Sequence, residues 1–202
     1  MNAHTELLVA TNNAGKVREL SQLLSGFPLR LRLLEEFPGV EEAEETGATF
    51  AENAAIKARH YSARTGLLTL SDDSGLAVDA LGGAPGVYSA RYAGREATYA
   101  ERMSKLTAEL DATGDADRRA RFVCVIAVAD PAASTLHTFE GECLGRLARA
   151  PRGTGGFGYD PLFVPDGYEQ TFGELPADIK HRLSHRARAL RKAARHLRER
   201  YA

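Results

Sequence analysis

The sequence lacks tryptophan, contains only two cysteines, and has no apolar run long enough to cross a membrane. Because a transmembrane helix needs about 20 consecutive apolar residues, we expect no membrane span and no membrane partner. Cys124 and Cys143 have neither CxxC spacing nor the spacing of a cysteine metal site, which favours a reducing, cytoplasmic compartment. Cys124 lies in an apolar run and is expected in the core. Residues 1–6 lack the basic start of a secretory signal peptide, so no leader is expected.

The charge is balanced overall but unevenly distributed along the chain. Lysine and arginine number 26 against 27 aspartates and glutamates, a formal net charge of -1, which argues against nucleic acid as a partner. Residues 35–52 nevertheless hold seven glutamates and no lysine or arginine, whereas residues 180–200 hold nine basic residues. Such blocks are ordinarily solvated faces, but a protein that binds both a metal and a polyphosphate needs both signs. The length fits a single domain over residues 1–202.

A polar loop near the N-terminus separates a short apolar strand from a helix. Residues 7–10 are apolar, Thr11-Asn12-Asn13-Ala14-Gly15-Lys16 follows, and apolar residues then recur at helical spacing as far as Gly26. The N–H groups of a helix N-terminus favour an anion, and Lys16 would add a full positive charge. The G-x-x-x-x-G-K-[ST] pattern is missing, so a P-loop is not supported. A simple capped helix start is the alternative.

The rest of the chain predicts a mixture of helices and strands. Capping boxes at Thr49 and Thr98 predict helices over residues 49–65 and 98–110, the first with Asn53 and Lys57 on one face. Residues 121–129 are rich in β-branched side chains and are expected to pair, antiparallel, with residues 136–147. Residues 153–161 contain G-x-G-x-x-G, but Pro161 leaves no room for the helix that a dinucleotide-binding fold requires. We therefore predict a loop there that presents an aromatic ring and an acid.

The last predicted helix begins near Ser184 and has a repeating apolar face. Lys180, His185 and Arg186 lie near its start, where a cation opposes the helix dipole. A bound anion or oxo group would explain this placement.

Two adjacent aspartates, Asp72 and Asp73, follow an apolar run over residues 67–70. The segment Asp72-Asp73-Ser74-Gly75 and the apolar run after it predict a strand, a sharp turn and a second strand. Because side chains alternate along a strand, Asp72 and Asp73 are expected to point to opposite sides. Taken alone, the segment also fits an ordinary polar hairpin turn capped by aspartate and serine.

Five ordered segments together carry a more specific signal. They are Thr11-Asn12-Asn13-Ala14-Gly15-Lys16; Glu44-Glu45-Thr46-Gly47 with Phe50, Glu52-Asn53 and Lys57-Ala58; Ser71-Asp72-Asp73-Ser74-Gly75-Leu76 through Ala90-Arg91-Tyr92; Gly155-Gly156-Phe157-Gly158-Tyr159-Asp160-Pro161; and Ser184-His185-Arg186. In this order, and over nearly the whole chain, they closely resemble the inosine/xanthosine triphosphate pyrophosphatase family. The chain departs from that pattern at Lys180-His181, where Lys-Asn is common, and at Phe172-Gly173-Glu174, where Ala-Glu is usual. Both departures concern contacts with the base.

The resemblance implies an activity and an architecture. The activity is Mg²⁺-dependent hydrolysis of a purine nucleoside triphosphate to the monophosphate and pyrophosphate, with a preference for ITP, dITP and XTP. The architecture is an α/β fold in which a long twisted mixed β-sheet is flanked by helices, with two lobes and a central substrate cleft. The resemblance also implies a homodimer.

The resemblance further implies a role for each matching residue. Those expected to bind the triphosphate are Thr11, Asn12, Asn13, Ala14, Gly15, Lys16 and Lys57, with a polar contact from Ser74. Glu45 and Asp73 would hold the metal, and Asp73 would accept the proton of the attacking water. Asp72 would support the turn or the residues behind the site.

The purine would be stacked on Phe157 and contacted by Gly158, Tyr159, Asp160, Lys180, His185 and Arg186. A 6-oxo group accepts a hydrogen bond where the 6-amino group of adenine donates one, so cationic donors there disfavour ATP.

Two other functions are compatible with parts of the pattern. One is a nucleotide-binding regulatory module without turnover, against which the acidic pair Glu45 and Asp73 argues. The other is a metal-dependent phosphatase, or a pyrophosphatase for other substrates such as modified pyrimidine triphosphates, against which Phe157 and Lys180 argue.

Overall fold

The computed structural model describes residues 5–201. Residues 1–4 and 202 lie outside the described residues, and with them most of the segment on which the leader prediction rests. In chain order the helices and strands are β1 (Glu6–Val9), α1 (Ala14–Leu23), β2 (Arg30–Leu33), α2 (Phe50–Thr65), β3 (Leu68–Val78), α3 (Tyr99–Ala112), β4 (Arg119–Asp130), β5 (Thr135–Leu147), β6 (Phe163–Pro165), α4 (Ala177–Leu183) and α5 (His185–Tyr201). Short 3-10 helices lie at Leu34–Glu36, Asp79–Leu81 and Gly86–Arg91.

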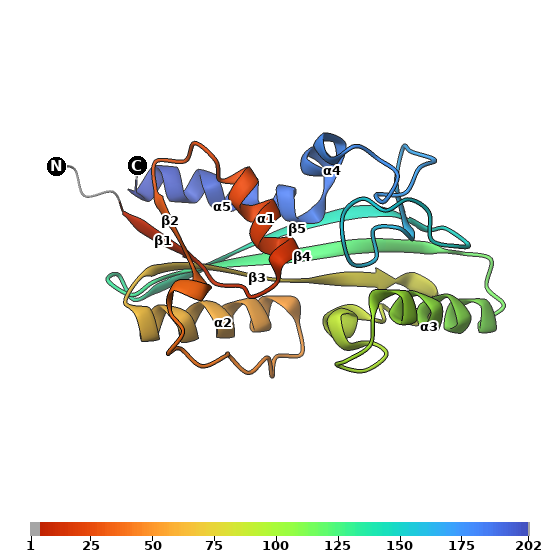
Figure 1. Ribbon diagram of the computed structural model, residues 1–202, viewed down its shortest axis with the longest axis horizontal. Helices are drawn as coiled ribbons and strands as arrows, with labels where there is room; N and C mark the ends of the chain where they lie inside the picture. The colour runs from red at the N-terminus through yellow and green to blue at the C-terminus, as the bar shows by residue number, and fades with distance from the viewer. Residues whose placement is uncertain (1–4, 202) are drawn as a thin grey trace. The chain divides into compact units, whose positions relative to one another are not determined.

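The strands form one mixed sheet of six strands in the order β2-β1-β3-β4-β5-β6. β1 pairs in parallel with both β2 and β3, whereas β6 pairs antiparallel with β5. β4 and β5 are neighbours joined by a short turn (Figure 1), as predicted for residues 121–129 and 136–147. The predicted α/β fold with a mixed sheet flanked by helices is confirmed.

The helices that the capping boxes predicted are confirmed. α2 follows Thr49, whose side chain accepts a hydrogen bond from the Glu52 N–H, and it ends at Gly66 in the left-handed conformation (φ 72°). α3 follows Thr98 in the same way. α4 was not predicted: it follows Pro176, and the extended backbone of Ser184 (ψ 153°) separates it from α5. No helix in the described part of the chain has the length and apolar character needed to cross a bilayer.

The predicted turn at Asp72-Asp73-Ser74-Gly75 is wrong. These residues lie in the middle of β3, an 11-residue strand that is buried along its length except at Ser74. Charged residues can remain inside a buried strand when each meets an opposite charge, and both aspartates do, as described below. The chain turns instead after β3, where Gly82 and Gly83 adopt positive φ angles of 60° and 90°.

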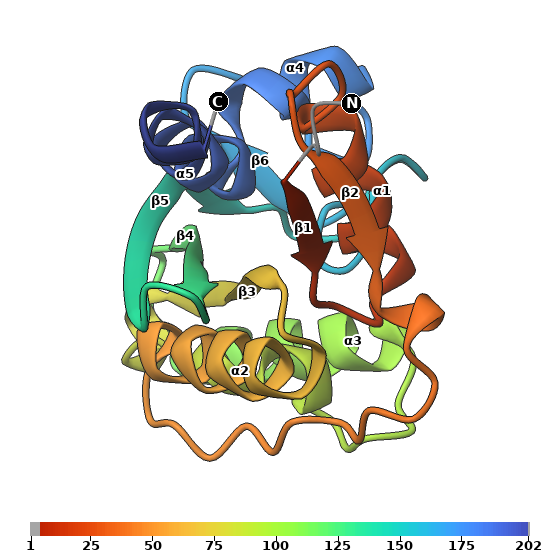
Figure 2. The same ribbon diagram turned by 90° about the vertical axis from the view of Figure 1, so that its left-hand side faces the viewer.

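The described residues form two compact units. The first contains the chain up to residue 73, residues 124–141 and residues from 186 onward, and the second contains residues 74–123 and 142–185. Within the first unit, α2 covers one face of the sheet while α1 and α5 cover the other (Figure 2). β1 alternates accordingly, because Leu7 and Val9 pack in the core with Leu20 and Leu190, whereas Leu8 packs on the opposite face.

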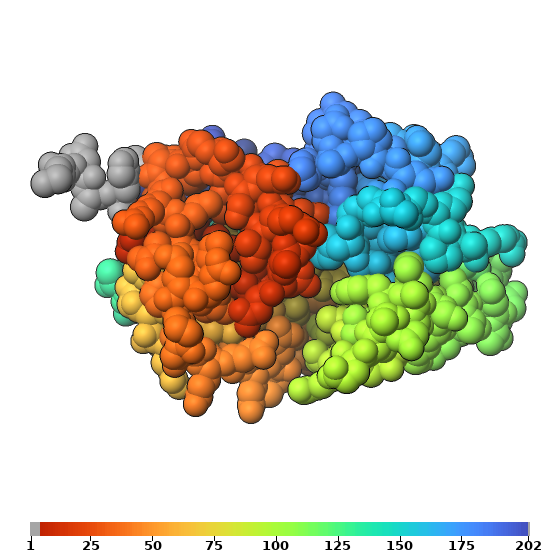
Figure 3. Space-filling model, in the orientation of Figure 1, coloured from red at the N-terminus to blue at the C-terminus, as the bar shows by residue number. Residues whose placement is uncertain are grey.

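In the space-filling view, the orange chain between α1 and α2 forms much of the visible surface of the first unit (Figure 3). Most of its glutamates are exposed, including Glu41, Glu42 and Glu44, as expected of a solvated acidic face. The second unit has its own core, in which Phe122, Phe163 and Phe172 pack with Leu106 and Leu110 of α3. Both cysteines are buried and neither forms a disulfide, and Cys124 lies in the core as predicted.

A histidine pair in the first unit predicts a pH-dependent stability. The rings of His137 on β5 and His196 on α5 lie 4.3 Å apart between centroids, and burial, followed by the nearby His137, lowers the pKa of His196. A histidine in the unfolded chain has a pKa of about 6.5, so it binds a proton more readily than His196 does in the folded protein. The melting temperature should therefore fall as the pH drops through about 6.5. Between about pH 7.5 and 5.5, the melting temperature of His196→Phe should fall by less than that of the unchanged protein. Equal falls in the two proteins would contradict this explanation.

Candidate functional site

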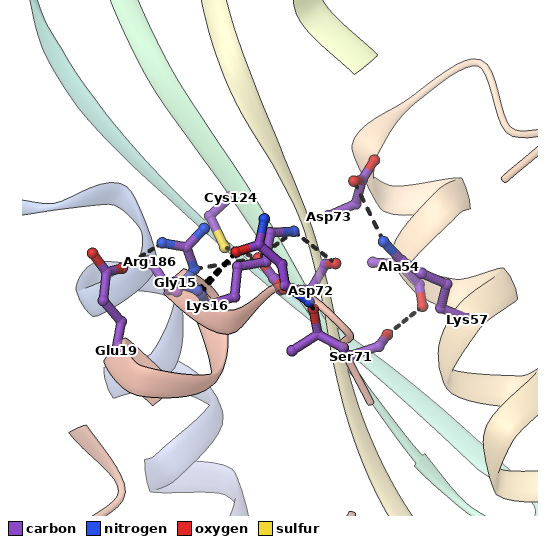
Figure 4. Close-up of polar contacts among 12 residues, drawn as sticks. Gly15, Lys16, Glu19, Ala54, Lys57, Ser71, Asp72, Asp73, Cys124 and Arg186 are labelled. Carbon is purple, nitrogen blue, oxygen red and sulfur yellow. Dashed lines mark hydrogen bonds and ion pairs between the residues drawn. The ribbon is translucent and has the colours of Figure 1, made fainter. Parts of the chain in front are cut away.

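Asp72 and Asp73 point to opposite faces of β3, as strand alternation predicted (Figure 4). Asp72 faces α1 and α5, where Lys16 and Arg186 contact it, and Asp73 faces α2, where Lys57 contacts it. Two neighbouring acids therefore lie in different surroundings, although they are only one residue apart.

Asp72 is held as a permanent anion. Its Oδ2 lies 3.0 Å from Lys16 Nζ and 3.3 Å from Arg186 Nε, and the residue is only 1% exposed. Burial by itself would raise the pKa of Asp72, but the two cations outweigh burial and hold that pKa well below its ordinary value. A carboxylate that binds a proton so weakly is unsuited to act as a general base, so its role is structural.

Arg186 is the largest fully buried side chain in the described residues. Besides Asp72, its guanidinium pairs with Glu19 of α1, another buried acid. Its planar fork can contact two carboxylates at once. The pairs join α1, β3 and α5 in one charged cluster, and these carboxylates offset the cation at the start of α5.

Asp73 belongs to a different cluster, which it forms with Lys57 and Glu45. Lys57 Nζ lies 2.7 Å from Glu45 Oε1 and 3.5 Å from Asp73 Oδ1. Asp73 Oδ2 is buried and accepts no hydrogen bond from any described residue. Burial raises the pKa of Asp73, and the attraction of Lys57 offsets this only in part. A carboxylate with a raised pKa is a stronger proton acceptor than an ordinary aspartate.

The same cluster fits a magnesium ion. Glu45 and Asp73 converge on one ammonium group, so a cation already lies between them. Mg²⁺ is commonly held by one or two carboxylates, with waters and substrate phosphates as its other ligands. No group of three or more metal-binding side chains occurs among residues 5–201, and this cluster provides two carboxylates, those of Glu45 and Asp73.

The loop over residues 11–16 opens α1 as predicted. Asn13 is the N-cap: its Oδ1 accepts hydrogen bonds from the N–H groups of Gly15 and Lys16, at 2.9 and 3.1 Å. Asn12, Asn13 and Ala14 are exposed, and the Thr11 hydroxyl accepts from the Asn13 N–H at 3.2 Å. This exposed helix start is suited to a phosphate group.

The second unit holds a separate cluster around Asp160 and Lys180. Their side chains form an ion pair of 2.6 Å, and they are 2% and 4% exposed. Asp160 Oδ2 also accepts the N–H of Phe157 at 2.7 Å, and Lys180 Nζ lies 4.6 Å from the centre of the Phe157 ring. Only glycine fits at position 156, because its φ is 70° and a Cβ would lie 2.1 Å from Asp160 Oδ2. The sequence predicted a loop that presents an aromatic ring and an acid, and in the structure Asp160 and Lys180 both contact Phe157 of this loop.

Other predicted purine contacts have clear packing roles. Tyr159 is buried, donates its hydroxyl to the Ser89 carbonyl at 3.0 Å, and packs edge to face on Tyr99. His185 stacks on Phe122 with 4.7 Å between ring centres. Gly158 has a positive φ of 68° and lies against Tyr99.

Arg186 belongs to a different unit from Asp160 and Lys180. Arg186 lies in the first unit with Asp72, while Lys180 and Asp160 lie in the second. Ser74, partly buried, directly follows Asp73 in β3.

Glu19, the second partner of Arg186, was not predicted from the sequence. Its position could have indicated burial, because it lies next to Leu20 on the apolar side of α1, one turn from Lys16.

The fold and these clusters define an α/β protein with two buried charge clusters on its first unit and one on its second. Residues 7–196 match the model of the Ham1 family. The chain is 50% identical over 188 residues to the dITP/XTP pyrophosphatase of Desulforamulus reducens, with 93% of each chain covered. It is 49% identical over 193 residues to the dITP/XTP pyrophosphatase of Geobacter sulfurreducens, with 96% of each covered. A solved HAM1 protein from Coxiella burnetii superposes with a TM-score of 0.89 at 44% identity, covering 96% of this chain and 99% of that one.

The chain belongs to the Ham1 family, and the family resemblance predicted from five sequence segments is confirmed.

The buried cluster around Arg186 predicts a large effect on stability. Arg186→Leu leaves the carboxylates of Asp72 and Glu19 without this partner, so the free energy of unfolding should fall by about 3–5 kcal/mol in urea denaturation. Arg188→Leu, an exposed change on the same helix, should alter it by less than about 0.5 kcal/mol. Similar losses in both variants would show that the ion pairs are not what stabilises this region.

Proposed function

We propose that this protein hydrolyses non-standard purine nucleoside triphosphates, dITP, ITP and XTP, to the nucleoside monophosphate and pyrophosphate. The relatives from Desulforamulus reducens and Geobacter sulfurreducens are named dITP/XTP pyrophosphatases and match nearly the whole chain. Such a reaction would keep these nucleotides out of DNA and RNA.

The observation that carries the proposal is the difference between the two aspartates of β3. The Asp72 carboxylate is paired with the cations of Lys16 and Arg186, which hold its pKa low, whereas burial raises the pKa of Asp73. In the proposed reaction Asp73 accepts a proton from water, and that water attacks the triphosphate. The oxygen of that water forms a new P–O bond, one P–O bond of the anhydride linkage between the α and β phosphates breaks, and the departing group keeps the electron pair of the broken bond. The products are the monophosphate and pyrophosphate.

Positive charge close to Asp73 supports the same reaction. Lys57 contacts both Glu45 and Asp73, and Lys16 lies at the start of α1. In our proposal the residues of the loop, Thr11, Asn12, Asn13, Ala14, Gly15 and Lys16, bind the triphosphate together with Lys57 and Ser74. Glu45 and Asp73 would hold Mg²⁺, which offsets the negative charge of the phosphates.

The purine end of the substrate is assigned to the second unit. Phe157 offers a stacking surface, and Asp160 fixes its backbone through the Phe157 N–H. The ammonium group of Lys180 carries three N–H donors, and a 6-oxo purine would accept one of them. Adenine presents a donor at that position, so it would leave polar groups without partners. Gly158, Tyr159, His185 and Arg186 remain predicted contacts of the base.

The proposal has three further parts. The protein acts as a homodimer, works on the cytoplasmic nucleotide pool without a membrane or nucleic-acid partner, and uses residues 1–202 as one domain. Two buried cysteines without a disulfide agree with a reducing compartment.

The experiment that tests the proposal is a substrate panel with product analysis. The protein is incubated with Mg²⁺ and dITP, ITP, XTP, dATP, dGTP or a modified pyrimidine triphosphate, and the products are separated. We expect the monophosphate and pyrophosphate from the first three, at a much higher rate than from dATP. A diphosphate with free phosphate would reject the proposal, and nucleotide binding without any turnover would favour the regulatory module.

Asp73→Asn tests the proton acceptor. The amide keeps the shape of the side chain but cannot take up the proton or the full metal charge, so kcat should fall by at least about 100-fold. Binding of ITP, measured by calorimetry, should largely survive. Asp79→Asn, an exposed change just after the same strand, is the matched control and should keep normal turnover. A near-normal kcat in Asp73→Asn would remove Asp73 from its assigned role.

A further inference from the structure

The acidic loop, residues 44–49, is tied to the first turn of α2 through three consecutive backbone N–H groups. Gly47 donates to Asn53 Oδ1 at 2.8 Å, whereas Ala48 and Thr49 donate to Glu52 Oε2 at 2.7 and 3.1 Å. The two bonds to Glu52 belong to an exposed capping box, a common way to begin a helix. The bond to Asn53 is different, because this residue lies beyond the capping box and is fully buried.

Asn53 is an unusual residue for its position. It is 0% exposed inside a helix, where an apolar side chain would ordinarily be more favourable. Since Gly47 offers an N–H, the oxygen of the amide must face it, which fixes the orientation of the side chain. The amide nitrogen is buried and has no hydrogen-bond partner among residues 5–201. Burying an amide nitrogen without a hydrogen-bond partner is unfavourable, so the presence of Asn53 here points to a role for its oxygen, which accepts the hydrogen bond from Gly47.

The contact is also very close. A Cβ at position 47 would lie 2.6 Å from Glu52 Cβ and 2.8 Å from Asn53 Oδ1, so only glycine allows the loop to approach α2 this closely. The position of the loop relative to α2 is therefore set by Gly47 of the loop and Asn53 of the helix.

The contact between Gly47 and Asn53 lies next to Glu45. Glu45 is two residues before Gly47, and its carboxylate meets Lys57, which is one helical turn beyond Asn53 on the same face of α2. Lys57 in turn contacts Asp73. We infer that Asn53 is a positioning residue: by holding the backbone of Gly47, it keeps the carboxylate of Glu45 beside Asp73. The inference rests on the proposed function for the role of Glu45 as a metal ligand.

The first test measures the loop itself, without metal or nucleotide. Amide hydrogen exchange of Gly47, Ala48 and Thr49 is followed by NMR in the metal-free protein. Asn53→Ala should speed exchange at Gly47 by about tenfold, whereas Asn53→Asp, which keeps the acceptor oxygen, should leave it slow. Glu52→Ala is the matched control and should speed exchange at Ala48 and Thr49 but not at Gly47. Unchanged exchange at Gly47 in Asn53→Ala would overturn the inference.

The second test measures metal binding with Mn²⁺ as the probe, followed by electron paramagnetic resonance. Asn53→Ala should weaken Mn²⁺ binding by about tenfold, as removal of a residue behind a metal ligand commonly does. Gly47→Ala, which moves the loop while Asn53 stays intact, should do the same.

A double-mutant cycle separates positioning through Glu45 from a general loss of structure. In a Glu45→Gln background, Asn53→Ala should weaken Mn²⁺ binding by no more than about twofold further. A full additional tenfold loss would overturn the inference, as would the absence of Mn²⁺ binding in the unchanged protein. Intact Mn²⁺ binding without hydrolysis of any triphosphate would reject only the proposed function.

Discussion

The buried charge of Asp72 is the constraint on which the first unit depends. An ionised carboxylate in the middle of a buried strand is very costly unless cations meet it. Lys16 and Arg186 provide them, so α1 and α5 must both pack on the same face of β3. Arg186 also needs the carboxylate of Glu19, which fixes α1 a second time. The apolar core around Leu20, Leu70 and Leu190 then forms where these ion pairs already require the helices to be.

The same constraint separates the two aspartates in chemistry. Asp72 pairs with Lys16 and Arg186 on its face, whereas Asp73 pairs with Lys57 on the other face, where burial raises its pKa. Strand alternation thus gives two identical residues opposite pKa shifts, lowered at Asp72 and raised at Asp73. The second unit uses a related device, in which the buried pair of Asp160 and Lys180 fixes the loop that carries Phe157. Buried ion pairs position the residues around each cluster.

Local signals in the sequence were reliable where neighbouring residues decide the structure. The capping boxes at Thr49 and Thr98 act within one helical turn, and both helices begin where they predicted. The loop before α1 and the loop that carries Phe157 follow from Asn13 and from Gly156 in the same local way. The alternation that separates Asp72 from Asp73 also needs only the geometry of a strand. The ordered motifs identified the family, since they depend on the order of residues rather than on their contacts.

The tertiary structure alone decided what depends on residues far apart in the chain. A polar Asp-Asp-Ser-Gly segment predicts a turn until cations from α1, α2 and α5 are known to meet it, and Arg186 is 114 residues away from Asp72. The free oxygen of Asp73, the pairing of Arg186 with Glu19 and the hold of Asn53 on Gly47 all arise from packing. The sequence by itself determined which residues carry charge and how they alternate. Only the folded chain decided which of those charges are neutralised, because that depends on which helices burial brings to each face of β3.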